Sequence, residues 1–438
     1  MTNILNIVDR LVDERVGIVG HVLDIPEDGA TRECVYMSAY TCNLRIVNPR
    51  QKRKDFFLGC GVAANRSKAM AKALGEAVEH YCSANYDAED LPLVSFDRAR
   101  FPCVRPDEFA LFAPEQYAEP DFPYRPFTRK TRVRWVAGLG LMTQETLHVP
   151  ASMVFLPYDQ VLRGEPAITQ QISTGLACHS SPITAAISGI CEVIERDAIA
   201  ITWQARLPRS QIRLETLSLS NQQLFSRIQR PGASVSLLHL VMDHGIPVIF
   251  ATMRNTAPEA PALIVGAAAN LDPERAVQKS LEELAQFQPI AQFMKSERPK
   301  FDPGKRWEQV IDFESHTNIY SYHANLHHTD FLFQNHRAIS FRDIPNLSTG
   351  DAATDLEILI QHIGALKHKI VIVDVTTEDV RSLGLWVFRA VIPGFHPLFI
   401  GHRFRALGGN RLWEVPQKLG FSGINRGQGD NPAPHPFA

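Results

Sequence analysis

Three separate segments of the sequence carry the same pattern, in which two acidic or amide side chains stand three residues apart within a run of helical periodicity. The pairs are Glu76 and Glu79, Glu192 and Glu195, and Glu283 and Gln286. Side chains at this spacing project from one face of a helix. Small or apolar residues flank each pair, so these side chains lie beside the stripe that packs against the rest of the fold. The chain must therefore fold with carboxylates next to the buried faces of three helices.

Carboxylates gathered near a protein core repel one another and stay ionised only where cations share the site. Magnesium suits such oxygen donors, because it commonly takes one or two carboxylates together with substrate phosphates. Arg196, directly after Glu195, adds a guanidinium that can bind a phosphate with two hydrogen bonds. The pattern predicts a nucleotide–magnesium site built from helices rather than from a glycine-rich loop.

Two other interpretations of the pairs stay open at this point. A Glu-x-x-Glu pair on an amphipathic helix is common, and a solvated face explains any one of them. The occurrence of all three weakens that explanation without removing it. A di-iron carboxylate bundle needs Glu-x-x-His on two helices, whereas His80 stands one residue after Glu79.

Other motifs are weaker signals. GCG at 59–61 and GLG at 138–140 lack the glycine spacing of a dinucleotide-binding loop, and no GxxxxGKS sequence occurs. The HxxxHH cluster at 323–328 is interpreted as a surface patch. Cys178, beside His179, would need a base from elsewhere in the fold to act as a nucleophile.

Charge and cysteine content narrow the class of protein. Lys and Arg total 45 against 47 Asp and Glu, a net charge of −2, whereas a general nucleic-acid binder would carry a basic surplus. No apolar run approaches the roughly 18 residues that a membrane helix needs. Seven cysteines, an odd number without a CxxC motif, fit a reducing compartment rather than a disulfide framework. We therefore expect a cytoplasmic protein without nucleic-acid or membrane partners.

The apolar periodicity predicts an α/β (α+β) fold with mixed sheets. Helices are expected around residues 70–81, 183–203 and 273–287. Strands are expected at 17–26, 133–142, 147–157, 235–243, 246–255 and 262–271, and a strand, short helix and second strand at 368–394. Loops are expected at 92–130 and 172–182, and a break at 293–310. We expect one large body, 1–425, followed by a Pro-rich tail, 426–438.

Several of these segments resemble the YcaO family. GCGVAANRSKAMAKALGEAVEHY, STGLACHSSPITAAISGICEVIERDA and GAAANLDPERAVQKSLEELAQ are similar to its three ATP-binding motifs, and the ExxER that ends at Arg196 is the most specific piece. WVFRAVIPGFHPLFIGHRFRALGGNRLWEVPQKLG is similar to its C-terminal region. The PxPxP of the tail marks azoline-forming cyclodehydratases in this family. The resemblance covers nearly the whole chain and implies a YcaO-type fold, in which mixed sheets and helices converge on an ATP and magnesium site.

The resemblance also assigns roles to particular residues. The implied magnesium ligands are Glu76, Glu79, Glu192, Glu195 and Glu283. The implied nucleotide-binding residues are these five together with Ser173, Ser180, Arg196, Lys279, Gln286 and Arg389. The implied catalytic group at the reacting amide is Pro432, Pro434, Pro436 and the carboxylate of Ala438.

The implied reaction is ATP-dependent cyclodehydration of a ribosomally made precursor peptide. A Cys, Ser or Thr side chain attacks the preceding backbone carbonyl, the oxygen of the resulting hemiorthoamide is phosphorylated, and phosphate leaves to give thiazoline or oxazoline. We expect that no leader-binding domain precedes the family region in this chain. We therefore expect a leader-binding partner related to ubiquitin-activating enzymes. The resemblance further implies an FMN-dependent dehydrogenase in the same pathway and a homodimer.

Four positions depart from the family pattern. They are Lys72 in place of Ser, His80 in place of Arg, His179 in place of Gly and Thr184 in place of Glu. The departures at Lys72, His80 and Thr184 support an alternative in which the chain is a scaffold subunit that binds ATP or peptide without turnover. Another alternative keeps the ATP site and changes the nucleophile, with external sulfide giving a thioamide or an amide nitrogen giving an amidine. The tail favours azoline formation.

Overall fold

The computed structural model of the chain describes residues 4–24, 35–41, 58–63, 65–161, 164–297, 301–335 and 337–437. The chain divides into two compact units, Met1–Val193 with Gly350–Gly394, and Ile194–Thr349 with Phe395–Ala438. The boundary at residue 193 falls within helix α5 (Pro182–Gln204). The predicted body over 1–425 stays a prediction, and the Pro-rich tail is grouped with the second unit.

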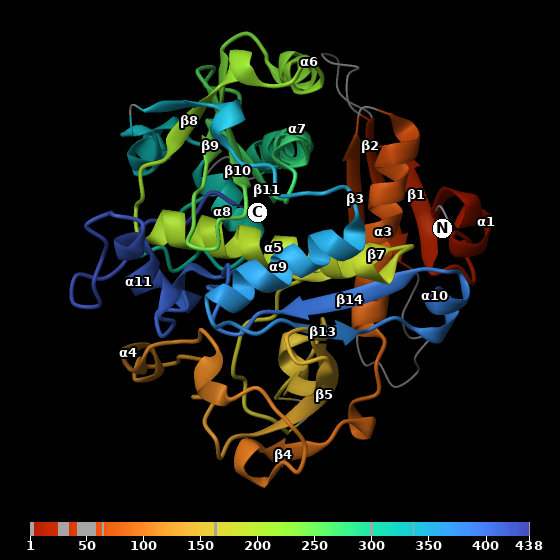
Figure 1. Cartoon of the computed structure of the whole chain (residues 1–438). Helices are drawn as coiled ribbons and strands as arrows, with labels where there is room; N and C mark the ends of the chain where they lie inside the picture. Colours follow the sequence, from red (N-terminus) through yellow and green to blue (C-terminus); the bar gives the residue numbers. More distant parts are fainter. Residues whose placement is uncertain are drawn as a thin grey trace. The chain divides into compact units, whose positions relative to one another are not determined.

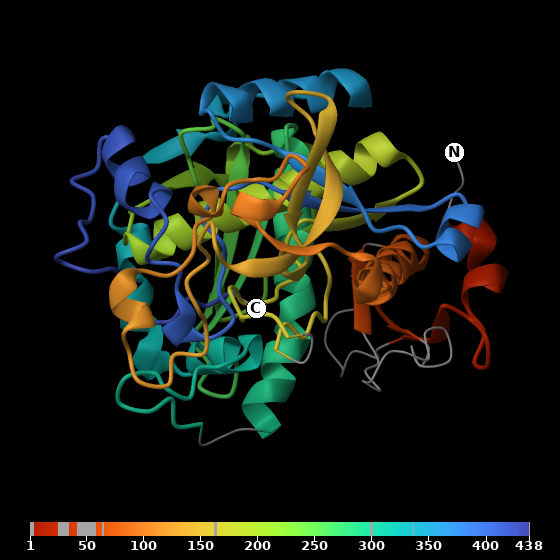
Figure 2. The same ribbon diagram turned by 90° about the horizontal axis from the view of Figure 1, so that it is seen from below.

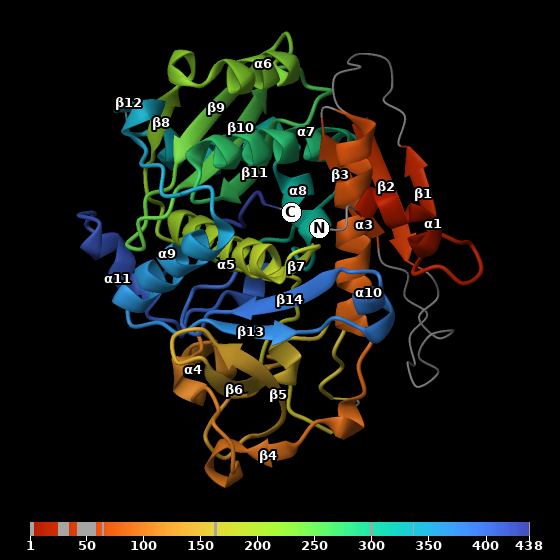
Figure 3. The same ribbon diagram turned by 45° about the vertical axis from the view of Figure 1, so that its right-hand side comes forward.

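In the first unit, a three-stranded antiparallel sheet packs against one long helix (Figure 3). The strands, in their order across the sheet, are β1 (Val19–Asp24), β2 (Val35–Thr41) and β3 (Leu58–Ala63); the helix is α3 (Arg66–Ala84), and α1 (Val8–Leu11) precedes them. A Cβ on Gly59 would lie 2.2 Å from the carbonyl oxygen of Ala73, and one on Gly61 would lie 2.0 Å from that of Ala69. The close approach of α3 to β3 therefore requires glycine at both positions.

The second sheet of the first unit is antiparallel and has the order β4-β5-β13-β14-β7, with β6 also pairing with β5. Its strands are β4 (Leu93–Ser95), β5 (Arg132–Gly140), β6 (Glu145–Pro150), β7 (Leu176–His179), β13 (Val371–Asp374) and β14 (Trp386–Val391). The helices of this part are α4 (Pro114–Tyr117), α9 (Ala352–Ala365) and α10 (Glu378–Ser382). Strand β13, helix α10 and strand β14 confirm the strand, helix and strand predicted at 368–394.

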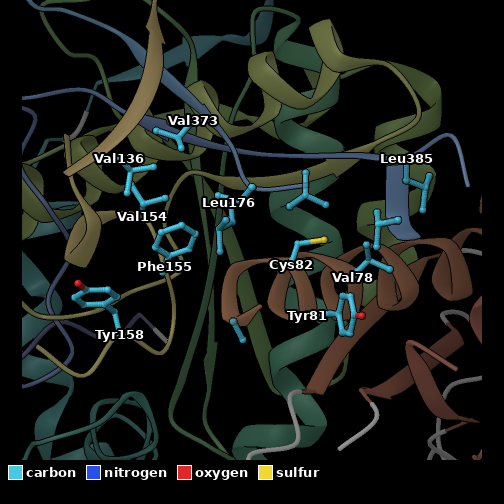
Figure 4. Packing of buried hydrophobic residues seen from close by; sticks show 14 of the residues in the cluster. Val78, Tyr81, Cys82, Val136, Val154, Phe155, Tyr158, Leu176, Val373 and Leu385 are labelled. Carbon is cyan, nitrogen blue, oxygen red and sulfur yellow. The ribbon is translucent and has the colours of Figure 1, made fainter. Parts of the chain in front are cut away.

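A hydrophobic core joins α3 to this second sheet (Figure 4). Val78, Tyr81 and Cys82 of α3 belong to one buried cluster with Leu176 of β7 and Val373 of β13. The Tyr81 hydroxyl also donates a hydrogen bond to Asp379 at 2.6 Å. Because α3 is fixed on both sheets of the unit, the directions of its remaining side chains, including the predicted glutamates, are fixed as well.

The second unit is built on a five-stranded sheet of order β11-β10-β9-β8-β12, whose strands β8 to β11 are labelled in Figure 1. Only the β8–β12 pair of this sheet is parallel. The strands are β8 (Ser210–Arg213), β9 (Ala233–His239), β10 (Val248–Asn255), β11 (Leu263–Ala269) and β12 (Ala338–Ser340). The helices are α6 (Leu219–Ile228), α7 (Pro273–Glu297), α8 (Phe313–Ile319) and α11 (Arg411–Lys418). Every residue of β11 is buried, and α7 packs against it. Strands β9, β10 and β11 confirm the three predicted strands.

Some predicted boundaries are wrong. Helix α7 runs through Pro289 to Glu297, so neither its predicted end at residue 287 nor a break starting at 293 is present (Figure 2). Packing explains the extension, because Ala291 is fully buried and the Lys295 ammonium donates to the carbonyls of Pro258 and Ala260. The predicted loop 172–182 contains β7, which forms by pairing with β14.

Three further predictions differ in part from the structure. The predicted loop 92–130 contains the short elements β4 and α4. The strand predicted at 147–157 ends at Pro150, and a 3₁₀ turn follows at Ala151–Met153. Residues 25 and 26 of the first predicted strand lie outside the described residues. None of the helices in the described part of the chain has the length and apolar character needed to cross a membrane.

Replacing Gly266 of β11 with Ala is expected to destabilise the second unit by about 1–3 kcal/mol, the usual range for overpacking. A Cβ there would lie 2.6 Å from the backbone nitrogen of Leu284 and 2.7 Å from the carbonyl oxygen of Ser280, both in α7. Gly75→Ala is the control, because a Cβ at Gly75 in α3 meets nothing within 4 Å and alanine favours a helix interior. Urea denaturation of both variants checks the prediction, and equal stabilities would contradict it.

Candidate functional site

The glutamates of α3 are each held by a backbone N–H from a strand. Glu76 Oε2 accepts the N–H of Cys60 in β3 at 2.7 Å, and Glu79 Oε1 accepts that of Cys178 in β7 at 2.7 Å. The two strands belong to different sheets of the first unit. The carboxylates, one helical turn apart, therefore reach from α3 to both sheets.

Glu192 of α5 is held in the same way by the loop before β7. Its Oε2 accepts the N–H of Gly175 at 3.0 Å. Arg389 of β14 fixes this loop by donating to the carbonyls of Ser173 at 2.5 Å and Ile172 at 2.7 Å. Burial lowers the pKa of Arg389 to about 10, so the guanidinium stays charged at neutral pH. Arg389 thus positions the loop that holds Glu192, and its predicted phosphate contact stays a prediction.

In the second unit, two glutamates bind the backbone of β11. Glu195 Oε2 accepts the N–H of Ala269 at 3.3 Å, and Glu283 Oε2, on α7, accepts that of Ala267 at 3.0 Å. Residues two apart in a strand point their N–H groups in the same direction. One side of β11 therefore anchors carboxylates from two helices.

The strands that donate these hydrogen bonds share a position in their sheets. β3, β7 and β11 each stand at the end of a strand order. An edge strand presents N–H groups that its sheet does not pair, and a buried N–H group needs an acceptor. The glutamates supply the acceptors, so the site residues also complete the edges of the sheets. Sequence reasoning placed the glutamates on helices but missed these backbone partners.

The two units repeat one local arrangement. In both, the glutamate accepts an N–H from the residue 16 positions earlier; the pairs are Cys60–Glu76 and Ala267–Glu283. Gly59 and Gly266 directly precede these donors. The helix sequences KALGEAVE and KSLEELAQ match in their K-x-L-x-E, with Gln286 in the place of Glu79. This repeat is the signal in the sequence that identifies the donor residues.

The departures from the family pattern make specific contacts. The Lys72 ammonium donates to the carbonyl of Val62 at 2.9 Å and so ties α3 to β3. His80 Nε2 lies 3.8 Å from Glu76 Oε1, so a protonated His80 forms an ion pair with that carboxylate. His179 Nδ1 accepts the N–H of Ser181 at 3.0 Å at the start of α5.

The remaining predicted nucleotide-binding residues lie close to the glutamates along the chain. Ser173 and Ser180 are half-buried on either side of β7. Lys279 is exposed on α7, and Gln286 is half-buried one turn after Glu283. Their nucleotide contacts stay predictions.

The cysteine beside His179 has a protonated thiol. Burial, and in second place the Glu79 carboxylate, raises the pKa of Cys178 well above its usual value. A thiolate is therefore disfavoured, and the structure gives no support to a cysteine nucleophile at this position. His323 and His327 are exposed and His328 is half-buried, as expected for a surface patch.

The Pro-rich tail is folded into the second unit and is held through its carbonyl groups. Trp203 Nε1, on α5, donates to the carbonyl of Ala433 at 2.8 Å, and the Tyr320 hydroxyl donates to that of Pro434 at 2.5 Å. Proline has no N–H to offer, so partners of such a segment reach it as hydrogen-bond donors to carbonyls. Of the predicted catalytic residues, Pro432 is exposed, Pro434 and Pro436 are buried, and Ala438 lies outside the described residues.

Two stacked histidines also fix the tail in the second unit. The rings of His316 and His435 lie 3.9 Å apart, and His316 Nδ1 stands 2.8 Å from the carbonyl oxygen of His435. Because a carbonyl only accepts, this Nδ1 carries the proton. His435 Nε2 likewise donates to the carbonyl of Phe399 at 2.9 Å, which leaves its Nδ1 to accept the N–H of Phe437 at 3.2 Å. Burial lowers the pKa of His316 to about 4, so its ring is neutral at physiological pH.

The carboxylate oxygens of the glutamates are of the chemical type that magnesium binds. The ion prefers carboxylate oxygens and completes its coordination with water and phosphate oxygens, and α3 and α5 each present two glutamates one turn apart with one oxygen fixed by a backbone N–H. Among the described residues, no three His, Cys, Asp or Glu side chains form a group able to hold a metal ion. The five predicted metal ligands stay predictions as individual assignments.

Comparisons with known proteins agree with this architecture. A family model described as YcaO cyclodehydratase, ATP- and Mg²⁺-binding, matches residues 60–396. An uncharacterised protein of Methanothermobacter thermautotrophicus is 26% identical over 359 residues, which cover 79% of this chain and 85% of the relative.

Solved structures share the fold. A heterocyclase in complex with substrate and cofactor matches with a TM-score of 0.80 at 21% identity; the match covers 100% of this chain, which spans 57% of that protein. YcaO from Methanopyrus kandleri, bound with AMPPCP and Mg²⁺, matches at 0.64 with 20% identity over 90% of each chain. The E. coli microcin synthetase McbBCD complex matches at 0.57 with 13% identity over 86% of this chain and 88% of that one.

The resemblance seen in the sequence, the mixed α/β fold and the two expected cofactors are thereby confirmed. The family model covers residues 60–396, a range that contains the glutamates held by backbone N–H groups of β3, of β11 and of the loop before β7. The chain belongs to the YcaO cyclodehydratase family, whose cofactors are ATP and Mg²⁺.

Proposed function

We propose that this chain catalyses the ATP-dependent cyclodehydration of Cys, Ser or Thr residues in a ribosomally made precursor peptide. The observation that carries the proposal is that glutamates at the family's motif positions are each oriented by a backbone N–H. Phosphoryl transfer depends on positioned charge more than on covalent help from the protein. Side chains that are fixed before the nucleotide arrives are suited to that task.

The bonds changed in the proposed reaction are few. The side-chain sulfur or oxygen of the substrate residue bonds to the preceding carbonyl carbon and loses its proton, which gives a hemiorthoamide. Bound ATP would supply the phosphoryl group that makes the former carbonyl oxygen a leaving group, and Mg²⁺ would neutralise charge on the phosphates. Loss of phosphate and of the amide proton leaves a C=N bond, so one ring forms for each ATP converted to ADP and phosphate.

In the proposed reaction, the protein's side chains position the magnesium ions and the phosphates of the nucleotide. We assign magnesium binding to Glu76, Glu79, Glu192, Glu195 and Glu283. We assign contacts with the phosphates or ribose to Ser173, Ser180, Arg196, Lys279 and Gln286. We assign to Arg389 the positioning of the loop before β7, whose Gly175 binds Glu192. The tail residues Pro432, Pro434, Pro436 and Ala438 are assigned to the vicinity of the reacting amide. The rigid backbone of alternating prolines supports this last assignment, because such a segment loses little entropy on ordering.

The proposed partners follow from the peptide substrate and from the family resemblance. A protein related to ubiquitin-activating enzymes would grip the leader of the precursor, an FMN-dependent dehydrogenase would oxidise the azolines, and the chain would pair with a second copy of itself. One structural neighbour is a component of a microcin synthetase complex, which supports an enzyme that works with partners. We expect the isolated chain to be weakly active.

Mass spectrometry of a reconstituted reaction tests the proposal. The purified chain is mixed with MgATP, the partner and a candidate Cys/Ser/Thr-rich precursor peptide, which we expect to be encoded near its gene. Loss of the mass of one water per ring is expected, and full cyclisation by the chain alone would contradict the need for a partner. Exchange of oxygen for sulfur would indicate a thioamide-forming enzyme. Loss of one water without consumption of a Cys, Ser or Thr side chain would indicate an amidine. An unchanged peptide would leave the scaffold alternative.

A further inference from the structure

The Pro-rich tail contacts Arg196, the last residue of the ExxER in the second ATP-binding motif. The guanidinium of Arg196 lies over the ring of Phe437, 4.3 Å from its centroid. Phe437 is only 1% exposed. Arg196 Nε also stands 3.5 Å from Oε1 of Glu195, the carboxylate that β11 holds through Ala269. A residue assigned to the nucleotide phosphates is therefore in contact with the last described residue of the tail.

Helix α5 holds the tail at two points. Trp203, about two helical turns beyond Arg196, donates to the carbonyl of Ala433. Residues two turns apart share a face of the helix and stand about 10 Å apart, a span that Ala433 to Phe437 covers as an extended chain. Since the tail is also held at Pro434 and His435, the ring of Phe437 is fixed where it meets Arg196.

A ring and a phosphate can bind one guanidinium at the same time. The ring attracts the flat face of the guanidinium, whereas the five N–H donors point outward along its edge. Arginine has a long side chain with many rotamers, and ordering it costs free energy on binding. A buried ring against one face selects a position of the side chain and excludes water from that face.

We propose that Phe437 is a positioning residue that holds Arg196 ready for the phosphates of the nucleotide. This inference rests on the proposed role of Arg196 in phosphate binding. It gives the tail a task in nucleotide binding, in addition to its proposed place near the reacting amide. It also links the order of the tail to the affinity for ATP.

Binding of MgATP and of adenosine to the full chain, measured by calorimetry, tests the inference. Phe437→Leu should weaken MgATP binding about fivefold to thirtyfold, the effect of a desolvated cation–π contact, and should leave adenosine binding nearly unchanged. Phe437→Tyr keeps the ring and should restore the affinity for MgATP. If Phe437→Leu does not fold, Phe437→Met takes its place, because the flexible unbranched side chain of Met adapts to irregular space in a core.

A double-mutant cycle with Arg196→Gln shows whether Phe437 acts through Arg196. If it does, the double variant should bind MgATP no more weakly than Arg196→Gln alone. Additive losses, or equal losses for MgATP and adenosine, would overturn the inference and indicate a general loosening of the unit.

Phe395→Leu is the matched control. The Phe395 ring lies 4.3 Å below the guanidinium of Arg411, the same distance as in the Arg196 pair, and it is also buried. Arg411 is held independently by Asp197 and Asp243, so this variant should keep its affinity for MgATP. A wild-type chain that fails to bind MgATP would count against the proposed function, whereas unchanged binding by Phe437→Leu would count only against the role of Phe437.

Discussion

Replacing Glu192 with Gln is expected to lower ATP-dependent peptide modification by about 10²–10³-fold, the usual cost of removing one preorganised group that stabilises transition-state charge. The amide oxygen of Gln can still accept the N–H of Gly175, which Glu192 accepts at 3.0 Å. The loop held by Arg389 therefore keeps its place, and only the negative charge is lost. Thermal melting should show a folded protein, while mass spectrometry of the peptide should show almost no rings.

Two further variants distinguish the loss of the Glu192 charge from the loss of its hydrogen bond to Gly175. Glu192→Ala removes both the charge and the acceptor, so it should add a loss of about 1–3 kcal/mol in stability, the cost of an unsatisfied buried N–H. Glu282→Gln is the matched control, because Glu282 of α7 is buried and accepts a hydrogen bond from Gln278 at 2.9 Å but has no assigned role. Near-normal turnover by Glu192→Gln would show that the metal assignment is wrong.

Removing residues 432–438 is expected to stop cyclisation and to destabilise the second unit by several kcal/mol. The deletion takes away the carbonyls that satisfy Trp203, Tyr320 and His316. Each donor left buried without an acceptor costs about 1–3 kcal/mol. Urea denaturation of the truncated chain and mass spectrometry of the peptide check the two parts separately.

A double replacement of Pro434 and Pro436 by Ala distinguishes the proposed catalytic role of the tail from its structural role. The carbonyls remain, so the anchoring hydrogen bonds remain possible, and the stability loss should be small, about 0.4–1 kcal/mol for each proline through the entropy of the unfolded chain. Cyclisation should still fall if rigid prolines are needed near the reacting amide. Unchanged cyclisation by both this variant and the truncated chain would remove the tail from the mechanism.

The sequence located helices better than it located boundaries. The periodicity of α3 and α5 follows from local packing of each helix face, and both predicted segments are helical. The end of α7 could not be found in this way, because the burial of Ala291 and the contacts of Lys295 lie outside local periodicity. Strand β7 was missed for a related reason: it exists only because β14 pairs with it.

The sequence by itself predicted the residues to which we assign the chemistry. Spacing alone put Glu76 and Glu79 on one helical face, and the ExxER motif placed Glu195 beside Arg196. Only the tertiary structure decided what holds them, since Cys178 and Gly175 come next to α3 and α5 through sheet formation, which brings together residues far apart in the chain. The tail shows the same division, because its prolines are visible in the sequence, whereas Trp203, Tyr320 and Arg196 meet it only in the folded chain.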